Sequence, residues 1–417
     1  MQDEQPFKIS VSQNALDSLA QKLAIATLPA PAPVTYTDSA LDSEDWTYGV
    51  PRPTLERLLI HWRTQFLPRW HEHQAVLNAL PQFTRSIEVD GHGVFTAHYV
   101  HKQSTHNPKG AIPLLFLHGW PGHFNEVSKL LPFLTTPPAN ASYPSFHVVA
   151  PSLPGFGFSS APTKTGFAVA QYAEFSHKLM LSLGYTEYVV QGGDWGSFIA
   201  HRLAYLYGPK YVKAWHSNFP AGRQPTLTRN PLLYLQHAVT PYSAKEKKGL
   251  QMMQWFWSEG QGYFAIQSTM PQTLSYALAD SPVGLLAWIY EKLVKWTDGY
   301  EWGDDEVLTW ISVYLFSASG PETTVRIYYE IAHQGNMDEF ARLWSPIPLG
   351  LSFFPHELVG GPRTWARTMG NVVFESEHNK GGHFAAYEQP LALADDLRAM
   401  FGKGGKAFGV VKGKDGY

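Results

Sequence analysis

The chain has 417 residues and a formal net charge of −3, with 16% charged residues, 14% aromatic residues and no cysteine. With this near-neutral charge, the chain has no excess of basic residues that would indicate binding to nucleic acid or to an anionic membrane. Its low net charge and ordinary hydrophobicity also exclude a mainly disordered chain. The absence of cysteine excludes disulfides, thiolate metal sites, iron–sulfur clusters and cysteine nucleophiles.

The N-terminus carries no recognisable targeting signal. Met1 to Glu4 is acidic and no apolar signal segment is visible, so we expect no secretory leader. The longest apolar runs, such as Ala111 to Leu117, have the length of a strand, whereas a membrane span needs about 18 residues. We therefore expect a soluble, cytoplasmic protein without a membrane span.

The first part of the chain predicts a helical extension that leads into strands. Apolar residues recur at helical spacing within residues 8–28 until prolines interrupt them, and residues 55–62 again have helical character. Two alternating runs within residues 83–100 flank Asp90 to Gly93 and predict a hairpin. We assign residues 1–85 to an N-terminal helical and meander extension.

The middle of the chain predicts an α/β fold. Short apolar strands are expected at residues 113–117, 146–150, 188–191 and 212–216, with a helix at 169–183. Apolar strands that alternate with helices are typical of a mostly parallel sheet covered by helices on both faces. Residues 86–224 are therefore the first part of this core.

The second half predicts a helical insertion followed by a return to the sheet. Residues 225–344 are mainly helical and rich in aromatic side chains, so we assign them to a helical cap. Strands at residues 349–354 and 372–375 and a closing helix at 391–401 complete the core over 345–402. The Gly- and Lys-rich residues 403–417 are expected to form a solvated tail.

A candidate nucleophile follows the strand at 188–191. Gly192, Asp194 and Gly196 match the nucleophile elbow G-x-S-x-G with aspartate in place of serine. Small residues two before and two after the nucleophile are needed because the strand-to-helix turn is sharp. Alone, the pattern is equally compatible with a helix cap. Ser197 is a rival nucleophile, but it lies beyond the elbow and is expected to face along the helix, so we reject it.

A second loop follows the strand at 113–117. His118 to Gly122 occupies the position from which this fold supplies one oxyanion-hole N–H, the other coming from the residue after the nucleophile. The predicted donors are the backbone N–H groups of Trp120 and Trp195. Viewed alone, the loop could equally be an ordinary β-turn fixed by Pro and Gly.

An acid and a histidine follow the last two predicted strands. Glu357 and then His383 come after Asp194, which is the order nucleophile, acid, histidine of this fold. All three follow the carboxyl ends of separate strands, where such sheets bind ligands. His378 is a neighbouring competitor for the histidine role.

An aspartate nucleophile suggests displacement at an sp³ carbon. A carboxylate is already ionised at neutral pH, so it can form an ester directly and leave His383 to activate water in a second step. An epoxide oxygen leaves as an alkoxide and needs an acid, whereas a halide needs only N–H donors. Tyr263 and Tyr328 in the cap are candidate acids, although periodicity does not distinguish them from other tyrosines.

Six segments together resemble an epoxide hydrolase of the microsomal-type branch of the α/β-hydrolase superfamily, which includes soluble fungal members. The resemblance covers nearly the whole chain, and its segments are Leu77 to Phe83, His98 to His101, His118 to Gly122, Gln267 to Thr273, Phe353 to Pro355 and Gly381 to Phe384, besides the elbow. It implies the α/β-hydrolase fold with an inserted helical cap and hydrolysis of an epoxide to a vicinal diol.

The resemblance also implies a role for each site residue. Asp194 resembles the nucleophile, His383 the water-activating base and Glu357 the acid that orients it. Tyr263 and Tyr328 match the two cap tyrosines, with Tyr329 as the alternative to Tyr328. These tyrosines, with Trp120 and Trp195, are the expected substrate-binding residues.

No metal or organic cofactor is required, and the expected partners are a small apolar or aromatic epoxide and water, without nucleic acid. A homodimer is compatible with the sequence, which does not give the oligomeric state. Because the family includes hormone-processing and detoxifying enzymes, the substrate stays open.

Three other functions use parts of the same pattern. A haloalkane dehalogenase shares the aspartate nucleophile, and Trp195 could serve it as a halide donor, but the two cap tyrosines favour the epoxide. A catalytically inactive hydrolase fold used for binding is disfavoured by the intact Asp194, Glu357 and His383. An esterase that uses Ser197 ranks last.

Overall fold

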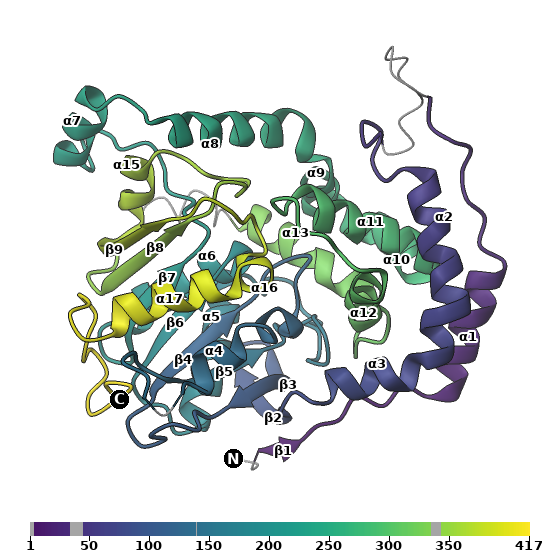
Figure 1. The fold of residues 1–417 in the computed structure, drawn as a ribbon, viewed down its shortest axis with the longest axis horizontal. Coiled ribbons are helices and arrows are strands. Elements are labelled where there is room, and N and C mark those ends of the chain that lie inside the picture. Colours follow the sequence, from purple (N-terminus) through teal and green to yellow (C-terminus); the bar gives the residue numbers. More distant parts are fainter. Residues whose placement is uncertain (1–3, 34–44, 139, 335–342) are drawn as a thin grey trace.

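The computed structural model describes residues 4–33, 45–138, 140–334 and 343–417. Residues 1–3, on which part of the targeting prediction rests, and residues 34–44 and 335–342 of the predicted extension and cap lie outside this range. The described strands form one nine-stranded sheet in the order β1-β2-β3-β5-β4-β6-β7-β8-β9 (Figure 1). The strands are β1 (Gln5–Pro6), β2 (Gln82–Val89), β3 (Gly93–Lys102), β4 (Ile112–Leu117), β5 (Phe146–Pro151), β6 (Tyr188–Gly192), β7 (Val212–Ser217), β8 (Pro348–Phe353) and β9 (Asn371–Glu377).

The sheet is antiparallel at one edge and parallel through the rest. β1, β2, β3 and β5 pair antiparallel, and all pairs from β5 to β9 are parallel. Every residue of β4, β5 and β6 is buried, as expected for parallel strands that are covered on both faces. The predicted hairpin and the predicted parallel sheet are confirmed, whereas the two-residue β1 had no sequence signal.

Helices cover both faces of the sheet. On one face α4 (Leu131–Thr135) packs against α17 (Pro390–Phe401), and on the other α5 (Val169–Ser182) packs against α6 (Asp194–Tyr207) (Figure 1). The short α15 (Arg363–Ala366) and α16 (Ala385–Glu388) lie in the connections around β9. The parallel sheet covered by helices on both faces, predicted from the alternating pattern, is therefore confirmed, as is the α/β-hydrolase fold that the resemblance implied.

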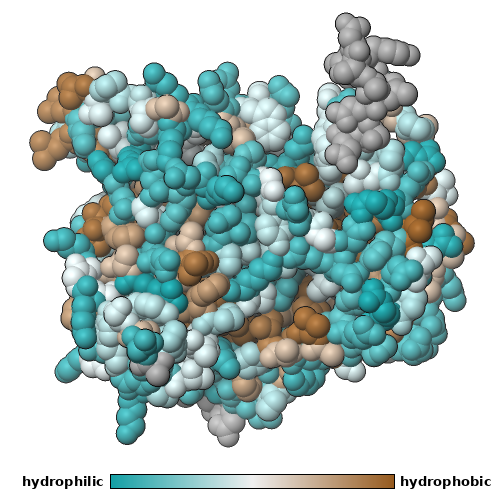
Figure 2. Space-filling model, viewed as in Figure 1, coloured by the Kyte–Doolittle hydropathy of each residue, from teal (hydrophilic) through white to brown (hydrophobic). Residues whose placement is uncertain are grey.

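A set of helices is inserted between β7 and β8. These are α7 (Pro231–Val239), α8 (Ala244–Trp255), α9 (Gly262–Thr269), α10 (Pro271–Asp280), α11 (Pro282–Lys295), α12 (Asp304–Leu315) and α13 (Arg326–His333). α7 and α8 extend along the β8–β9 side, and α9 to α13 gather beside the site (Figure 1). Apolar side chains on α7, namely Leu232, Leu235 and Val239, are exposed, and the brown area at the upper left of Figure 2 marks this helix.

The N-terminal extension packs against this cap. It contains α1 (Gln13–Ala24), α2 (Arg52–His61) and α3 (Trp70–Leu77), which run along the right side of Figure 1. His61 Nε2 lies 2.6 Å from Asp305 Oδ1 in α12, and Arg57 pairs with Asp304 beside it. The predicted boundary between residues 85 and 86 falls inside β2.

The C-terminal residues are packed rather than solvated. Ser145 N–H donates to Gly416 O (2.8 Å), and Gly416 N–H donates to Gly110 O (2.8 Å). Ala407 and Val411 are 1% and 3% exposed. The prediction of a solvated tail is wrong because the backbone pairs with neighbouring loops and the side chains of Ala407 and Val411 are buried, although Phe408 and several lysines stay exposed. None of the helices in the described part of the chain has the length and apolar character of a membrane span.

The topology creates a crevice at the carboxyl ends of β4 and β6. The chain leaves β4 to form β5 on one side and later returns to form β6 on the other. Ligands of open α/β sheets bind at such a switch point. Leu117 at the end of β4 is paired with Gly192 at the end of β6, so the loop at 118–122 and the elbow at Asp194 emerge side by side.

Candidate active site

The turn from β6 into α6 holds Asp194 in a strained backbone conformation. Its φ is +48°, a left-handed value that is uncommon outside glycine and that marks functional turns. A Cβ at Gly192 would lie 2.3 Å from Gly196 O, and a Cβ at Gly196 would lie 2.1 Å from Leu117 O. Both contacts are shorter than atoms tolerate, so this turn excludes side chains at the two flanking positions.

The His118 to Gly122 loop contacts the Asp194 carboxyl group. Trp120 N–H donates to Asp194 Oδ1 at 2.7 Å, and Asp194 is the first residue of α6, where the helix dipole favours negative charge. A Cβ at Gly119 would lie 2.1 Å from Asp194 Oδ1, so the close approach needs glycine. Trp195 follows Asp194 directly in α6, and its N–H as the second oxyanion donor stays a prediction.

His118 keeps this loop in place. Leu153 N–H donates to His118 Nε2 (3.2 Å), so Nδ1 carries the proton and donates to Gly119 O (2.9 Å). Burial lowers the pKa of His118 to about 4. His118 is therefore neutral near pH 7, and its two hydrogen bonds connect the 118–122 loop to the loop at Leu153.

His383 lies between Asp194 and Glu357. Its Nε2 is 3.4 Å from Asp194 Oδ2, and its Nδ1 is 2.8 Å from Glu357 Oε1. The side chains of His383 and Glu357 are 2% and 1% exposed. The loops that carry them are joined by a parallel bridge between His356 and Gly382. The structure thus brings the three predicted residues together in one chain of contacts.

Burial alone would lower the pKa of His383, because it disfavours the charged imidazolium. The carboxylates of Glu357 and Asp194 outweigh this effect and hold the pKa of His383 well above its ordinary value. Part of this shift depends on the negative charge of Asp194.

The competing histidine belongs to a separate cluster. His378 Nε2 lies 2.7 Å from Asp396 Oδ2, and its ring stacks on Phe354 at 4.4 Å between centroids. His378 N–H donates to Phe353 O at the end of β8. These contacts give His378 a structural role beside the sheet, and they leave His383 as the histidine that reaches Asp194.

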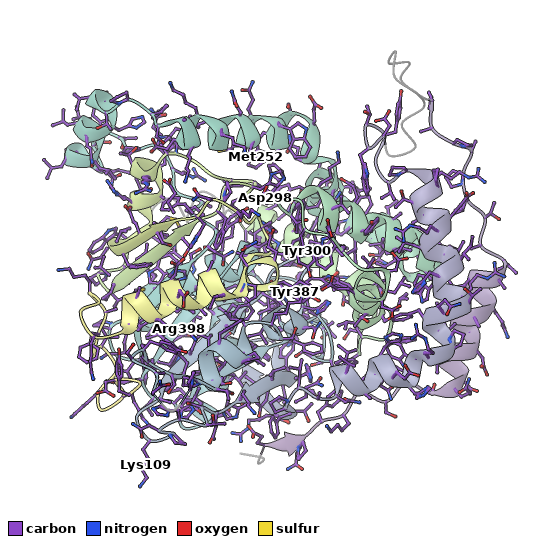
Figure 3. The ribbon with its side chains drawn as sticks, viewed as in Figure 1. Lys109, Met252, Asp298, Tyr300, Tyr387 and Arg398 are labelled. Atoms are coloured by element: carbon purple, nitrogen blue, oxygen red, sulfur yellow. The ribbon has the colours of Figure 1, made fainter. Side chains whose placement is uncertain are left out.

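The cap holds the loop that carries His383. Backbone N–H groups of His383 and Gly381 donate to Trp296 O (2.9 Å) and Asp298 Oδ2 (3.0 Å), both just after α11. Glu388 in α16 accepts Gly382 N–H at 2.8 Å. Asp298 lies at this junction with Tyr300 and Tyr387, whose rings are 6.2 Å apart (Figure 3). The position of the histidine therefore depends on the cap as well as on the sheet.

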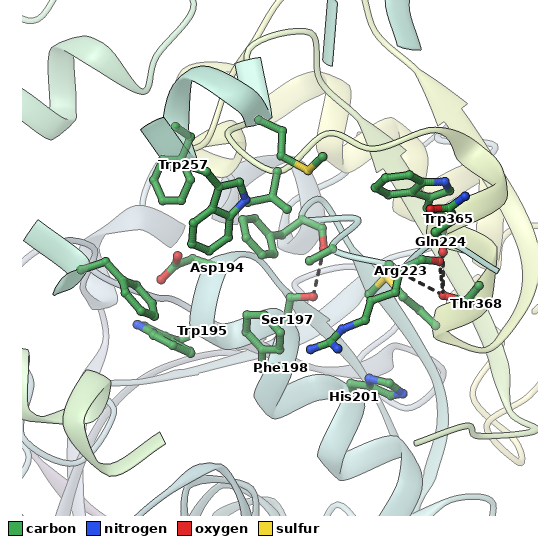
Figure 4. Close-up of a pocket in the computed structure, with 18 of the residues that line it drawn as sticks. Asp194, Trp195, Ser197, Phe198, His201, Arg223, Gln224, Trp257, Trp365 and Thr368 are labelled. Atoms are coloured by element: carbon green, nitrogen blue, oxygen red, sulfur yellow. Dashed lines mark hydrogen bonds between the residues drawn. The ribbon is translucent and has the colours of Figure 1, made fainter. Parts of the chain in front are cut away.

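A large cavity of about 640 Å³ opens on one side of Asp194 (Figure 4). This volume is in the range of small-molecule sites. Its walls are largely aromatic and apolar and include Phe198, Phe219, Met253, Phe256, Trp257 and Phe264. The cavity is therefore suited to an apolar or aromatic molecule.

Both predicted cap tyrosines line this cavity. Tyr263 in α9 and Tyr328 in α13 line it together with Asp194, and the centroids of the two rings are 5.8 Å apart. Tyr263 stacks on Trp120 (5.2 Å), and Tyr328 packs edge-on against Trp195 (4.9 Å). The alternative, Tyr329, stacks instead on His333 at 3.9 Å on the same helix. The structure therefore places Tyr328, and not Tyr329, at the site.

Burial raises the pKa of both cavity tyrosines well above the ordinary value, and the negative charge of Asp194 raises it further. The two phenols therefore stay protonated and remain hydrogen-bond donors near neutral pH. The Tyr328 hydroxyl is buried at the cavity wall beside the Tyr263 phenol and the Trp195 side chain, both of which contribute to its pKa. A ligand atom in the cavity can accept a hydrogen bond from it.

Ser197 lines the cavity but is turned away from the histidine. Its hydroxyl lies 2.7 Å from Ser217 Oγ and 3.2 Å from Phe219 O, the latter drawn as a dashed line in Figure 4. With its hydroxyl engaged there, Ser197 has no general base of the kind a serine nucleophile needs.

Two polar residues that the sequence did not single out also lie near Asp194. Glu126 and Asn218 line a second, much smaller cavity together with Asp194 and His383. Glu126 follows Gly122 by four residues, which is the only sequence signal for it, and Asn218 directly follows β7. The described residues contain no group of three or more His, Asp and Glu side chains placed to hold a metal ion.

Comparisons with known proteins identify the family of the chain. Residues 4–127 match the sequence profile of the family "Epoxide hydrolase N terminus", and residues 112–257 match that of the "alpha/beta hydrolase fold". The chain is 33% identical to epoxide hydrolase 1 of Sus scrofa, over 95% of this chain and 88% of that protein.

Solved structures give the same result. The structure of Aspergillus niger epoxide hydrolase is 33% identical, covers 95% of both chains and has a TM-score of 0.78. Juvenile hormone epoxide hydrolase from Bombyx mori is 29% identical, with coverage of 95% of this chain and 93% of that chain and a TM-score of 0.83. The chain thus belongs to the epoxide hydrolase family of the α/β-hydrolase fold.

Proposed function

We propose that the protein hydrolyses an epoxide to a vicinal diol through a covalent ester on Asp194. The observation that supports this most strongly is the placement of Asp194 between two kinds of group. Tyr263 and Tyr328 face it across the large cavity, while Trp120 N–H and His383 contact its carboxyl oxygens. A halide leaving group would not need two buried phenols as acids.

In the first step Asp194 attacks one ring carbon of the epoxide. A bond forms between a carboxylate oxygen and that carbon, and the bond from the same carbon to the epoxide oxygen breaks. The opening oxygen gains negative charge and takes a proton from the Tyr263 and Tyr328 hydroxyls, whose raised pKa keeps them protonated until then. Trp120 N–H holds the other carboxyl oxygen and so orients the attacking one.

In the second step His383 activates water against the ester. Once Asp194 is esterified its charge is gone, and the pKa of His383 falls because one of the two carboxylates that raised it has been neutralised. The proton that His383 carries in the free enzyme then passes to the phenolate left by ring opening, which restores the phenol. The neutral imidazole can now accept a proton from water, and Glu357 at 2.8 Å stabilises the imidazolium that forms. The hydroxide adds to the ester carbonyl, and the N–H groups of Trp120 and Trp195 hold the oxyanion.

The cavity favours apolar or aromatic epoxides. Its lining gives an epoxide substituent aromatic faces to pack against, and its volume of about 640 Å³ admits more than a minimal epoxide. We infer that affinity rises with the apolar surface of the substituent, at about 25 cal/mol per Å² buried.

The test of the mechanism is a single turnover in heavy-oxygen water with enzyme in excess over an aryl epoxide such as styrene oxide. Because water attacks the ester carbonyl, the first diol is expected to carry no solvent oxygen, and the label is expected in the Asp194 carboxylate. Mass spectrometry of the diol and of the peptide that contains Asp194 measures both. A first diol that already carries the label means direct attack of water on the epoxide and contradicts the ester.

The phenols can be tested separately from the nucleophile. Tyr263→Phe and Tyr328→Phe are each expected to slow ester formation by roughly 10- to 100-fold, because each removes one proton donor and leaves the other. Ester hydrolysis should change far less. Rapid quenching followed by intact-protein mass spectrometry separates the two rates. Tyr329→Phe is the matched control because that ring lies outside the cavity against His333, and an equal loss in this variant would contradict the assignment.

A further inference from the structure

A second cavity, separate from the large one, also borders Asp194. It is lined by residues of the 119–122 loop, of the elbow and of the His383 loop, together with Glu126 and Asn218. Asp194 lines both cavities, whereas Tyr263 and Tyr328 line the large one and His383 lines the small one. Asp194 is therefore shared by the cavity that holds the tyrosines and the cavity that holds the histidine.

The small cavity has room for about one water molecule. Its volume is about 10 Å³, and a single water needs roughly 10 to 15 Å³ of this kind together with two to four polar partners. Four polar side chains line it: Asp194, His383, Glu126 and Asn218. The size excludes an epoxide, and the polar lining suits water.

Glu126 is buried at this cavity by the shape of the loop before it. Its side chain turns back onto Gly122, where a Cβ would lie only 1.6 Å from Glu126 Oε1. Burial raises the pKa of Glu126 to about 8. The negative charge of Asp194 raises this pKa further, whereas His383 and a hydrogen bond with the His123 backbone lower it. Near neutral pH the group is therefore mostly an uncharged acid that does not compete with Asp194 for the imidazolium.

Asn218 offers a donor to the same space. Gln191 Nε2 donates to Asn218 Oδ1 at 2.7 Å, which fixes the amide so that its Nδ2 is the atom that can donate elsewhere. That nitrogen lies beside the elbow, since a Cβ at Gly193 would approach it to 2.9 Å. The carbonyl-type oxygen of Glu126 and the amide nitrogen of Asn218 together provide one acceptor and one donor.

We propose that this cavity is the binding site of the hydrolytic water and that Glu126 and Asn218 are the residues that position it. A water there donates one hydrogen bond to His383 Nε2 and the other to Glu126, and it accepts a hydrogen bond from Asn218 Nδ2. Its remaining lone pair is then directed at the ester carbonyl of Asp194.

The reaction from this site is balanced within the residues described. The water proton passes to His383, and the oxygen bonds to the carbonyl carbon. The bond from that carbon to the diol oxygen breaks, and the departing alkoxide takes the proton back from His383. Asp194 is left as a carboxylic acid, and it gives its proton to His383, which restores the carboxylate and the imidazolium of the free enzyme. Glu126 and Asn218 keep their protons throughout. The inference rests on the proposed function, since it places the water of the second step.

The test compares two variants of Glu126 in single-turnover experiments with styrene oxide. Glu126→Leu fills similar space without an acceptor, whereas Glu126→Gln keeps an oxygen at the same place. We expect Glu126→Leu to slow ester hydrolysis by about 10- to 100-fold, as a misplaced reactant does, with ester formation within about 3-fold of wild type. We expect Glu126→Gln to hydrolyse its ester within about 5-fold of wild type, because an amide oxygen also accepts from water.

The possible outcomes distinguish failure of the water site from failure of the proposed epoxide hydrolase mechanism. An ester that forms at the wild-type rate and then accumulates in Glu126→Leu, with recovery in Glu126→Gln, supports the water site. Wild-type hydrolysis in Glu126→Leu, or a loss shared equally by ester formation and hydrolysis, overturns it while leaving the covalent mechanism intact. Failure of the wild-type enzyme to form any ester contradicts the proposed function itself. Thermal unfolding of both variants beside wild type verifies that they fold.

Discussion

Asp194→Asn is expected to abolish diol formation, lowering kcat/KM by about 10⁴-fold or more, as removal of a nucleophile does in other hydrolases. Asparagine has nearly the shape of aspartate and tolerates the left-handed backbone, in which φ is +48° here. Its Oδ1 can still accept Trp120 N–H, which donates to Asp194 at 2.7 Å. The variant thus removes the ionised nucleophile while it keeps the fold of the elbow. Intact-protein mass spectrometry should find no covalent adduct after exposure to an aryl epoxide.

The comparison variant is Ser197→Ala, which removes the rival nucleophile three residues along α6. Since its hydroxyl is engaged by Ser217 and Phe219, this variant should still form the Asp194 ester. Loss of the adduct in Ser197→Ala with its retention in Asp194→Asn would reverse the assignment. The mass of Asp194→Asn should be verified at the end of the assay, because conversion of Asn to Asp would restore the nucleophile.

The parts of the site that could be predicted from the sequence are those whose geometry is set by residues close together in the chain. The elbow requires small residues at fixed offsets, and Gly192 and Gly196 show the reason in their contacts of 2.3 Å and 2.1 Å for an added Cβ. The loop at 118–122 follows β4 directly, and Glu357 and His383 come four and six residues after β8 and β9, strands whose apolar runs are visible in the sequence. The sheet brings these loops to one edge, and contacts with the cap complete the position of His383.

The parts that could not be predicted depend on packing between distant segments. Tyr263 and Tyr328 lie on α9 and α13, and only the docking of these helices brings their rings within 5.8 Å. The resemblance to a known family supplied them, and periodicity did not. Asn218 reaches the site because β7 is the neighbour of β6, a pairing that strand propensity alone does not define. The packed C-terminal residues were misjudged for the same reason, since their partners lie near residues 110 and 145.

His383→Gln is expected to trap the covalent ester. Ester formation needs Asp194 and the phenols but no base, so it should continue, whereas hydrolysis should fall by at least about 10³-fold because general-base assistance is lost. The enzyme should therefore gain the mass of one substrate molecule and then stop. Intact-protein mass spectrometry measures this adduct, and peptide mapping should locate it on Asp194. His378→Gln is the matched control, since His378 lies against Asp396 and Phe354 instead.

The pH dependence of the wild-type enzyme provides the complementary result. In the free enzyme Glu357 and Asp194 hold the pKa of His383 well above its ordinary value against the effect of burial. In the ester the Asp194 charge is absent, so the pKa of His383 is lower than in the free enzyme, and the neutral imidazole that acts as base becomes populated. Hydrolysis should then slow as the pH falls through this lower pKa, and the fraction of enzyme held as ester should rise in acid. Ester that accumulates in acid in wild type, but at every pH in His383→Gln, identifies His383 as the group that titrates, whereas the same pH profile in both enzymes would assign the titration to another group.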